Sequence, residues 1–230
     1  MPVTNLLRIL PLMSWCLVLL LTGCQSSGMG NALQTLQAAV WGPAPPLSSN
    51  LDPRFSYLRV TVDKKVAFLA LGYMDPHPQG PVEVWYSAER EVIRLQNGYL
   101  VGAAGTLTEW RQVRLPARPA WRELAKNGTP HTMERRRDVM PGYQFNVIDS
   151  LRVVPIAPPE RSQLLGIAPT ALTWFEESLI STKTNHSLAE NLRPSRYAVE
   201  FIGSSERVVY AEQCLSADLC MTWQRWQAGQ

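Results

Sequence analysis

The fold class is decided by the stretch Val92-Ile93-Arg94-Leu95-Gln96-Asn97-Gly98-Tyr99-Leu100-Val101. Two short, apolar-rich runs flank the dipeptide Asn97-Gly98. Asn-Gly between such runs is a strong signal for a tight hairpin turn, because both residues tolerate a positive φ. The stretch therefore predicts two antiparallel strands joined by a two-residue turn.

The same strand pattern continues on both sides of this hairpin. Upstream, residues 57–62 alternate between apolar and polar side chains, Asp63-Lys64 forms a turn, residues 66–71 are apolar on both faces, and residues 82–87 alternate again. Downstream strand candidates are 107–115, 143–156, 171–181, 197–201, 208–210 and 220–226. About ten strands with one buried face predict a mainly β fold, either a curved antiparallel sheet or a partial (half) barrel with one or two short helices.

Helical spacing is rare in this sequence. Residues 31–41 carry apolar side chains at near-helical spacing and predict a short amphipathic helix, which could pack on the β domain or lie on a membrane surface. Residues 120–126 predict a helical turn, and 187–192 predict either loop or a small helix. A proline-rich linker spans 43–53, while 134–138 is highly charged and carries no strand signal.

The N-terminus has the pattern of a secretory signal. Arg8 is the single charge before an apolar run, 9–21, that is shorter than the roughly 20 residues a membrane-spanning helix needs. Leu21-Thr22-Gly23-Cys24 then stands where an Ala-x-Ala-like cleavage site would be, and it resembles the bacterial lipoprotein signal. That resemblance implies cleavage before Cys24 and lipid on its thiol and new amine. The alternative is a plain signal peptide with an incidental cysteine.

Lipid on Cys24 would attach the mature chain to a membrane, because two or more acyl chains give stable anchoring. Gln25 follows the cysteine, where an Asp usually marks retention in the inner membrane. We therefore expect the periplasmic face of the outer membrane. The expected organisation is a lipoprotein signal peptide at 1–23, a lipidated tether with a short helix and linker at 24–53, and a β-rich periplasmic domain at 54–230.

Charge and cysteine usage narrow the partners and the compartment. Lys and Arg number 22 against 19 Asp and Glu, a balance too even to indicate nucleic acid. Cys16 would leave with the signal, so Cys214 and Cys220 remain as a pair. In an oxidising periplasm this pair predicts a disulfide, whereas a metal or redox pair would need a nearby His or a Cys-x-x-Cys spacing.

No catalytic, metal or cofactor motif is found in the sequence. His77, His131 and His186 each fall in a predicted loop and indicate no site. Glu176 and Glu177 are neighbours in a predicted strand, so they point to opposite faces and cannot flank one glycosidic bond. We therefore predict no catalytic residue, no bound metal and no cofactor, and leave any ligand-binding residues open.

Two groups of residues each allow two interpretations. The basic run Arg135-Arg136-Arg137 could meet an anionic polysaccharide or a lipid phosphate, although such a run is usually a solvated face. Four tryptophans within strand candidates either fill the core or form a platform on which sugars stack; they are Trp85, Trp110, Trp174 and Trp223. Core packing needs no further assumption.

The order of several short motifs resembles one protein family. Tyr57-Leu58-Arg59-Val60 leads into Ala67-Phe68-Leu69-Ala70-Leu71-Gly72-Tyr73, and Val84-Trp85-Tyr86-Ser87 precedes the opening hairpin. Towards the C-terminus come Trp174-Phe175-Glu176-Glu177 and the run 197–210. Together with the lipoprotein signal, this order is similar to the YjbF/GfcB-type lipoproteins, the group 4 capsule polysaccharide lipoprotein family, over most of 30–226.

The resemblance implies an outer-membrane lipoprotein associated with the production or export of an extracellular polysaccharide or capsule. It implies a β-rich, half-barrel-like domain without a catalytic motif, and only Cys24 carries over as a site residue. The leading hypothesis is a non-enzymatic accessory factor that contacts polysaccharide or polysaccharide-export proteins. The alternatives are a lipid carrier with an apolar cavity and a glycan hydrolase with two carboxylates about 5 to 10 Å apart in a cleft.

Overall fold

A computed structural model describes residues 51–183 and 192–228, which belong to one compact unit from Leu47 to Gln230. Four predicted features lie outside the described residues: the signal at 1–23, Cys24, the helix at 31–41, and His186. The same holds for most of the predicted segment at 187–192.

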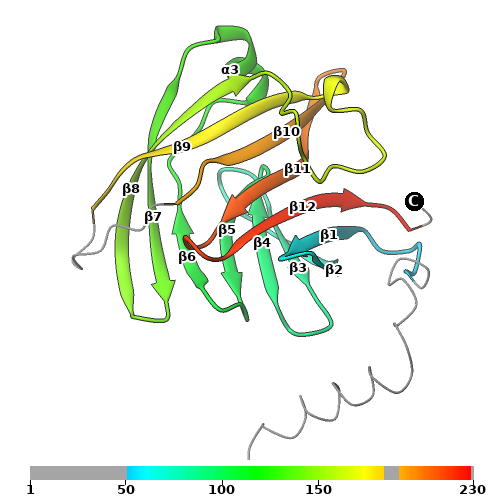
Figure 1. The fold of residues 1–230 in the computed structure, drawn as a ribbon, viewed down its shortest axis with the longest axis vertical. Helices are drawn as coiled ribbons and strands as arrows, with labels where there is room; N and C mark the ends of the chain where they lie inside the picture. The colour runs from blue at the N-terminus through cyan, green and yellow to red at the C-terminus, as the bar shows by residue number, and fades with distance from the viewer. Residues whose placement is uncertain (1–50, 184–191, 229–230) are drawn as a thin grey trace, which may run out of the picture. The chain divides into compact units, whose positions relative to one another are not determined.

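Twelve strands form the described unit, each antiparallel to its neighbours in the chain (Figure 1). Their bounds are β1 Tyr57–Val62, β2 Lys65–Asp75, β3 Val82–Tyr86, β4 Val92–Gln96, β5 Tyr99–Ala104, β6 Glu109–Arg114, β7 His131–Met140, β8 Gln144–Ile156, β9 Thr173–Lys183, β10 Ser195–Ile202, β11 Ser205–Cys214 and β12 Cys220–Trp226. The helix α3 spans Trp121–Asn127 and a 3-10 turn, η2, spans Pro169–Ala171. The predicted mainly β, curved antiparallel architecture is confirmed.

The sheet closes on itself, because β1 pairs with β12 as well as with β2. The register between the first and last strands runs from Tyr57 opposite Trp226 to Val62 opposite Met221. Closure gives every strand a hydrogen-bonded neighbour on both sides, which removes the exposed edges that an open sheet would present. The sequence predicted a curved sheet or a partial (half) barrel, and the structure shows that the curvature continues to a closed barrel.

The predicted hairpin around Asn97-Gly98 joins β4 to β5, and both turn residues have positive φ, 50° and 84°. This turn also reaches across to β11. A Cβ built on Gly98 would lie 2.2 Å from Cγ2 of Val208, so no larger residue could take this position without displacing β11. The glycine is needed both for the turn and for this close approach.

Several segments differ from the sequence-based expectation. β2 continues to Asp75, beyond the end of the predicted strand at 66–71. His131 begins β7 and does not lie in a loop, and β7 runs through the charged segment 134–138. The sequence of β7 lacks the usual alternation of apolar and polar residues, because two of its inward positions are occupied by Arg135 and Arg137.

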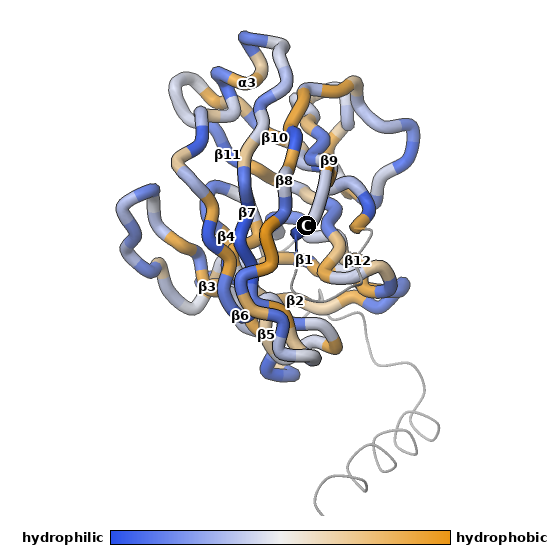
Figure 2. The backbone as a smooth tube through the Cα atoms, turned by 90° about the vertical axis from the view of Figure 1, so that its left-hand side faces the viewer, coloured by the Kyte–Doolittle hydropathy of each residue, from blue (hydrophilic) through white to orange (hydrophobic). Residues whose placement is uncertain are grey.

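Large side chains fill the interior. All four tryptophans in question are at most 2% exposed, so they are core residues and form no sugar platform. A barrel of eight strands is just wide enough for side chains to fill, and twelve strands enclose more space. Part of that space is taken by α3, whose Trp121 stacks on Tyr99 with ring centroids 4.7 Å apart. Figure 2 shows hydrophilic and hydrophobic residues interleaved along the strands.

The described residues contain no helix with the length and apolar character required to cross a membrane.

Candidate binding site at the barrel mouth

The basic run on β7 is divided between the two faces of the sheet. Arg136 is exposed and lies 3.5 Å from Glu134, as expected for a solvated face. Arg135 and Arg137 are only 5% and 1% exposed, so the prediction of a solvated face is wrong for them. The period of two in a strand turns alternate residues inward whatever their charge.

The two inward arginines belong to a buried ion cluster, defined as Arg135, Arg137, Asp149 and Glu177. Asp149 is fully buried and accepts hydrogen bonds from Nε of Arg135 at 2.9 Å and Nε of Arg137 at 2.7 Å. Arg135 also donates from Nη1 to Oε1 of Glu177 at 3.1 Å. β7, β8 and β9 therefore bring two cations and two carboxyl groups together inside the barrel.

An aromatic ring and a hydroxyl complete the surroundings of this cluster. The guanidinium carbons of Arg135 and Arg137 lie 4.5 and 5.0 Å from the ring centroid of Trp110. Oγ1 of Thr182 donates a hydrogen bond to Asp149 at 2.9 Å. Buried charges are tolerated only when paired and hydrogen-bonded, and this cluster meets both conditions.

The pKa values of the two carboxyl groups in the cluster are shifted in opposite directions. Burial raises the pKa of Asp149, but attraction to Arg135 and hydrogen bonds from both arginines outweigh it, and the pKa lies below its usual value. For Glu177, burial is the larger effect and the pKa is raised despite Arg135 and the hydroxyl of Tyr197. Both acids are buried and both contact Arg135. We therefore interpret the cluster as part of what stabilises the fold.

The other residues singled out from the sequence are scattered. Glu176 lies on the opposite face of β9 from Glu177 and 3.5 Å from Arg196, as its place in the strand predicts. His77 is an exposed loop residue whose Nδ1 lies 2.8 Å from the Gln96 amide. Within 51–183 and 192–228, no group of three His, Cys, Asp or Glu side chains is placed to hold a metal ion.

Cys214 and Cys220 form a disulfide, as their spacing predicts. They lie opposite each other where β11 turns into β12. The bond therefore closes one local hairpin at that end of the two strands.

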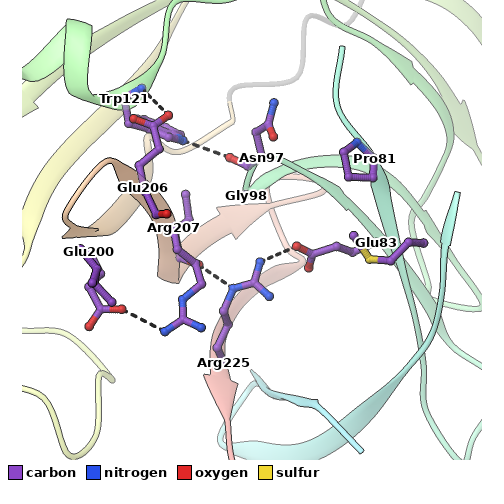
Figure 3. A pocket seen from close by; sticks show the side chains of 13 residues that line it. Pro81, Glu83, Asn97, Gly98, Trp121, Glu200, Glu206, Arg207 and Arg225 are labelled. Carbon is purple, nitrogen blue, oxygen red and sulfur yellow. Dashed lines mark hydrogen bonds and ion pairs between the residues drawn. The ribbon is translucent and has the colours of Figure 1, made fainter. Parts of the chain in front are cut away.

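At the other end of β11 and β12 is a pocket of about 500 Å³, which we call the mouth pocket (Figure 3). Its walls come from β2, β3, the β4–β5 turn, α3 and β10–β12. The residues that line it are Met74, Pro81, Glu83, Asn97, Gly98, Trp121, Glu200, Ile202, Ser205, Glu206, Arg207, Val208 and Arg225.

Ion pairs hold two sides of the mouth pocket. Nη2 of Arg225 lies 2.6 Å from Oε1 of Glu83, and its Nε donates to the carbonyl of Val208 at 2.8 Å. Nε1 of Trp85 donates to the second oxygen of Glu83 at 3.0 Å. A second pair, between Arg207 and Glu200 at 2.9 Å, is more exposed (Figure 3).

Glu206 attaches α3 to the barrel. Its two carboxylate oxygens accept hydrogen bonds from the backbone N–H groups of Trp121 and Arg122, at 3.0 and 2.9 Å. These N–H groups belong to the first turn of α3, where a carboxylate satisfies unpaired donors and meets the positive end of the helix. Nε1 of Trp121 donates to the carbonyl of Asn97 at 3.0 Å, which ties the helix to the hairpin turn as well.

Every charged side chain of the mouth pocket thus has a partner inside the pocket. Its carboxylates are held by arginines or by backbone N–H groups, and Met74, Pro81 and Ile202 add apolar surface. Such a lining suits an uncharged ligand rich in hydroxyl groups better than an acyl chain. Sequence reasoning missed this pocket: Glu83 and Arg225 are 142 residues apart, and no local pattern marks the pair.

Comparison with known proteins gives one family and one fold. The model of the family described as "Group 4 capsule polysaccharide lipoprotein gfcB, YjbF" matches residues 35–222. A solved structure, that of the hypothetical lipoprotein YmcC from Escherichia coli (K12), is similar with a TM-score of 0.52 and 12% identity. The match covers 86% of this chain and 97% of that chain, and at this identity it speaks for the fold alone. No curated protein matches the sequence.

Proposed function

The chain belongs to the YjbF family of group 4 capsule polysaccharide lipoproteins, and from this premise we propose that it is a non-catalytic accessory factor in capsule or exopolysaccharide production or export. In this proposal, lipid on Cys24 holds the chain at the periplasmic face of the outer membrane, where the β domain contacts polysaccharide during export. The mouth pocket is the place of contact.

The observation that carries the proposal is the internal pairing of the mouth pocket's charges. Arg225 with Glu83 and Arg207 with Glu200 present donors and acceptors whose charges are already balanced. Hydroxyl groups of a sugar can bind such groups by hydrogen bonds without bringing a charge of their own. The volume of about 500 Å³ falls within the usual range of small-ligand sites.

The two competing functions have less support. A carrier of acyl chains needs an apolar cavity, but the centre of the barrel is occupied by Trp85, Trp110, Trp223 and the buried ion cluster. A glycan hydrolase needs two carboxyl groups free to act on one bond. Glu83 and Glu200 each bind an arginine in the mouth pocket, and Glu206 binds α3.

The binding role is tested with oligosaccharides released from the producing strain's own surface polysaccharide. Calorimetry of the purified full chain in detergent should show saturable binding. Arg207→Gln combined with Glu200→Gln should weaken it about tenfold, because each lost hydrogen bond contributes roughly 0.5 to 1.5 kcal/mol. The matched control is Arg136→Gln with Glu134→Gln, a surface pair of the same kind on β7. Equal binding by both double variants would remove the mouth pocket as the contact site.

The anchor and the pathway are tested in cells. Cys24→Ala should release the chain from the membrane fraction, since the acyl chains supply the attachment. Deletion of the gene should alter the surface polysaccharide. A Cys24→Ala chain that stays with the membranes contradicts the anchor, and unchanged polysaccharide in a deletion strain contradicts the role in its production or export.

A further inference from the structure

A second pocket of about 500 Å³ lies at the end of β11 and β12 that is remote from the mouth pocket. We call it the basic groove. The ends of β1, β11 and β12, the loop that follows β8 and the residues just before β10 all contribute to it. The disulfide between Cys214 and Cys220 forms part of its wall.

Three cations reach the groove from three different segments. Lys64 lies in the β1–β2 turn, Arg161 in the loop after β8 and Arg193 just before β10. All three are exposed. Within the described residues, none of the three forms a hydrogen bond or an ion pair through its side chain, which sets them apart from the arginines of the mouth pocket.

The acidic residues of the groove do not balance these cations. Asp63 and Glu212 also line it. Glu212 already accepts a hydrogen bond from the hydroxyl of Tyr210 at 2.9 Å and lies 3.5 Å from Arg196, which is not a lining residue. Three cations against two carboxylates, one of which is already engaged, leave the described lining of the groove with a net positive charge.

The loop that carries Arg161 is held against the barrel. The backbone N–H of Gln163 donates to the hydroxyl of Tyr210 at 2.9 Å. Leu165 and Gln224 exchange two hydrogen bonds, at 2.9 and 2.7 Å. These hydrogen bonds fix the backbone of the loop, so the Arg161 side chain is the part that a ligand still has to order on binding.

We propose that the basic groove binds the acidic group, a carboxylate or a phosphate, of a charged saccharide. Arginine presents several N–H donors in a planar fork that matches both groups, and hydrogen bonds between ionised partners are the strong ones. That the bearer is a saccharide rests on the proposed function. The preference for an acidic group rests only on the three unpartnered cations.

The test measures binding of oligogalacturonate to the full chain in detergent by calorimetry, beside malto-oligosaccharides of the same length as the uncharged probe. Oligogalacturonate should bind, and binding should weaken as salt is raised, because exposed charges are screened. Arg161→Gln with Arg193→Gln should raise its Kd by about tenfold per arginine. The matched control, Arg90→Gln with Arg152→Gln, removes two exposed arginines elsewhere and should change Kd by less than about twofold.

Equal weakening by the two double variants would show attraction to overall charge and overturn the proposal, as would the absence of oligogalacturonate binding. A third probe, glycerol 1-phosphate, represents the headgroup of an anionic lipid. If it binds at Arg161 and Arg193 as tightly as oligogalacturonate, the sugar contributes nothing and the saccharide assignment is overturned. The Arg207→Gln and Glu200→Gln variant keeps the basic groove intact. Failure of the mouth-pocket proposal can therefore be distinguished from failure of the basic-groove proposal.

Discussion

The buried ion cluster and the basic groove place the same residue type in opposite circumstances. Arg135 and Arg137 are inside the barrel and bind Asp149, and Arg135 also binds Glu177. Arg161 and Arg193 are exposed and have no partner among the described residues. A count of charges therefore does not distinguish the two roles. Buried charges with partners hold this fold together, and exposed charges without partners are available to a ligand of opposite charge.

Removal of the central carboxylate of the buried ion cluster should have the largest effect on stability. Asp149→Asn keeps the shape but leaves two buried guanidinium groups without their shared counter-charge. Breaking a buried ion pair in this way costs about 3 to 5 kcal/mol in the free energy of unfolding. Urea denaturation followed by tryptophan fluorescence measures it.

The matched control is Glu134→Gln on β7, which removes a carboxylate from an exposed pair with Arg136. Surface pairs contribute about 0 to 1 kcal/mol, so this variant should unfold close to the wild type. Similar losses in the two variants would mean that burial of the cluster does not matter to stability.

The pH dependence separates the two acids of the cluster. The pKa of Asp149 is lowered, so its stabilising contribution is present above its ordinary value of 3.8 and is lost as the pH falls through the folded-state pKa. The gap between wild type and Asp149→Asn should therefore narrow below pH 3.8. For Glu177 the folded-state pKa is raised, so its contribution is present below 4.5 and is lost as the pH rises.

Urea unfolding of the wild type, Asp149→Asn and Glu177→Gln across an acidic pH series checks both signs. Relative to the wild type, Glu177→Gln should gain stability as the pH rises through the folded-state pKa, whereas Asp149→Asn should lose it as the pH rises from strongly acidic values. Parallel curves for the two variants would contradict opposite shifts within one cluster.

The disulfide gives the next smaller effect, at the groove end of β11 and β12. Cys214→Ser with Cys220→Ser should cost about 2 kcal/mol, because a short loop loses little chain entropy when it is closed. Urea unfolding of the oxidised protein beside the double variant measures it. Binding in the mouth pocket serves as the control, since that pocket lies at the other end of both strands and should keep its affinity.

Local chemistry was enough to predict most of the strands and the hairpin turn at Asn97-Gly98. Asn97-Gly98 marked a turn that the structure confirms, and the alternation at 57–62 marked β1. No local sequence pattern indicates that the sheet closes, because the two strands that close it contain Tyr57 and Trp226, from opposite ends of the domain. The pairing of Glu83 with Arg225, which forms one wall of the mouth pocket, also has no local signal in the sequence.

β7 shows why a hydrophobic pattern can fail. A strand is recognised by apolar residues on one face, but the inward face of β7 alternates Met133, Arg135, Arg137 and Val139. The arginines are stable there because β8 and β9 bring Asp149 and Glu177 into reach. Their environment depends on contacts far apart in the sequence, and so the basic run was interpreted as a solvated face.

The smallest expected effect on stability concerns the exposed arginines of the basic groove. Arg161→Gln with Arg193→Gln should leave the free energy of unfolding within about 0.5 kcal/mol of the wild type, because exposed residues without partners contribute little to stability. Reduced repulsion from Lys64 would favour a slight gain at low salt, since the three cations line one groove. Urea unfolding at low and high salt measures both. A loss comparable to that of Asp149→Asn would mean that these arginines hold the fold, and then they would not be free to bind an acidic ligand.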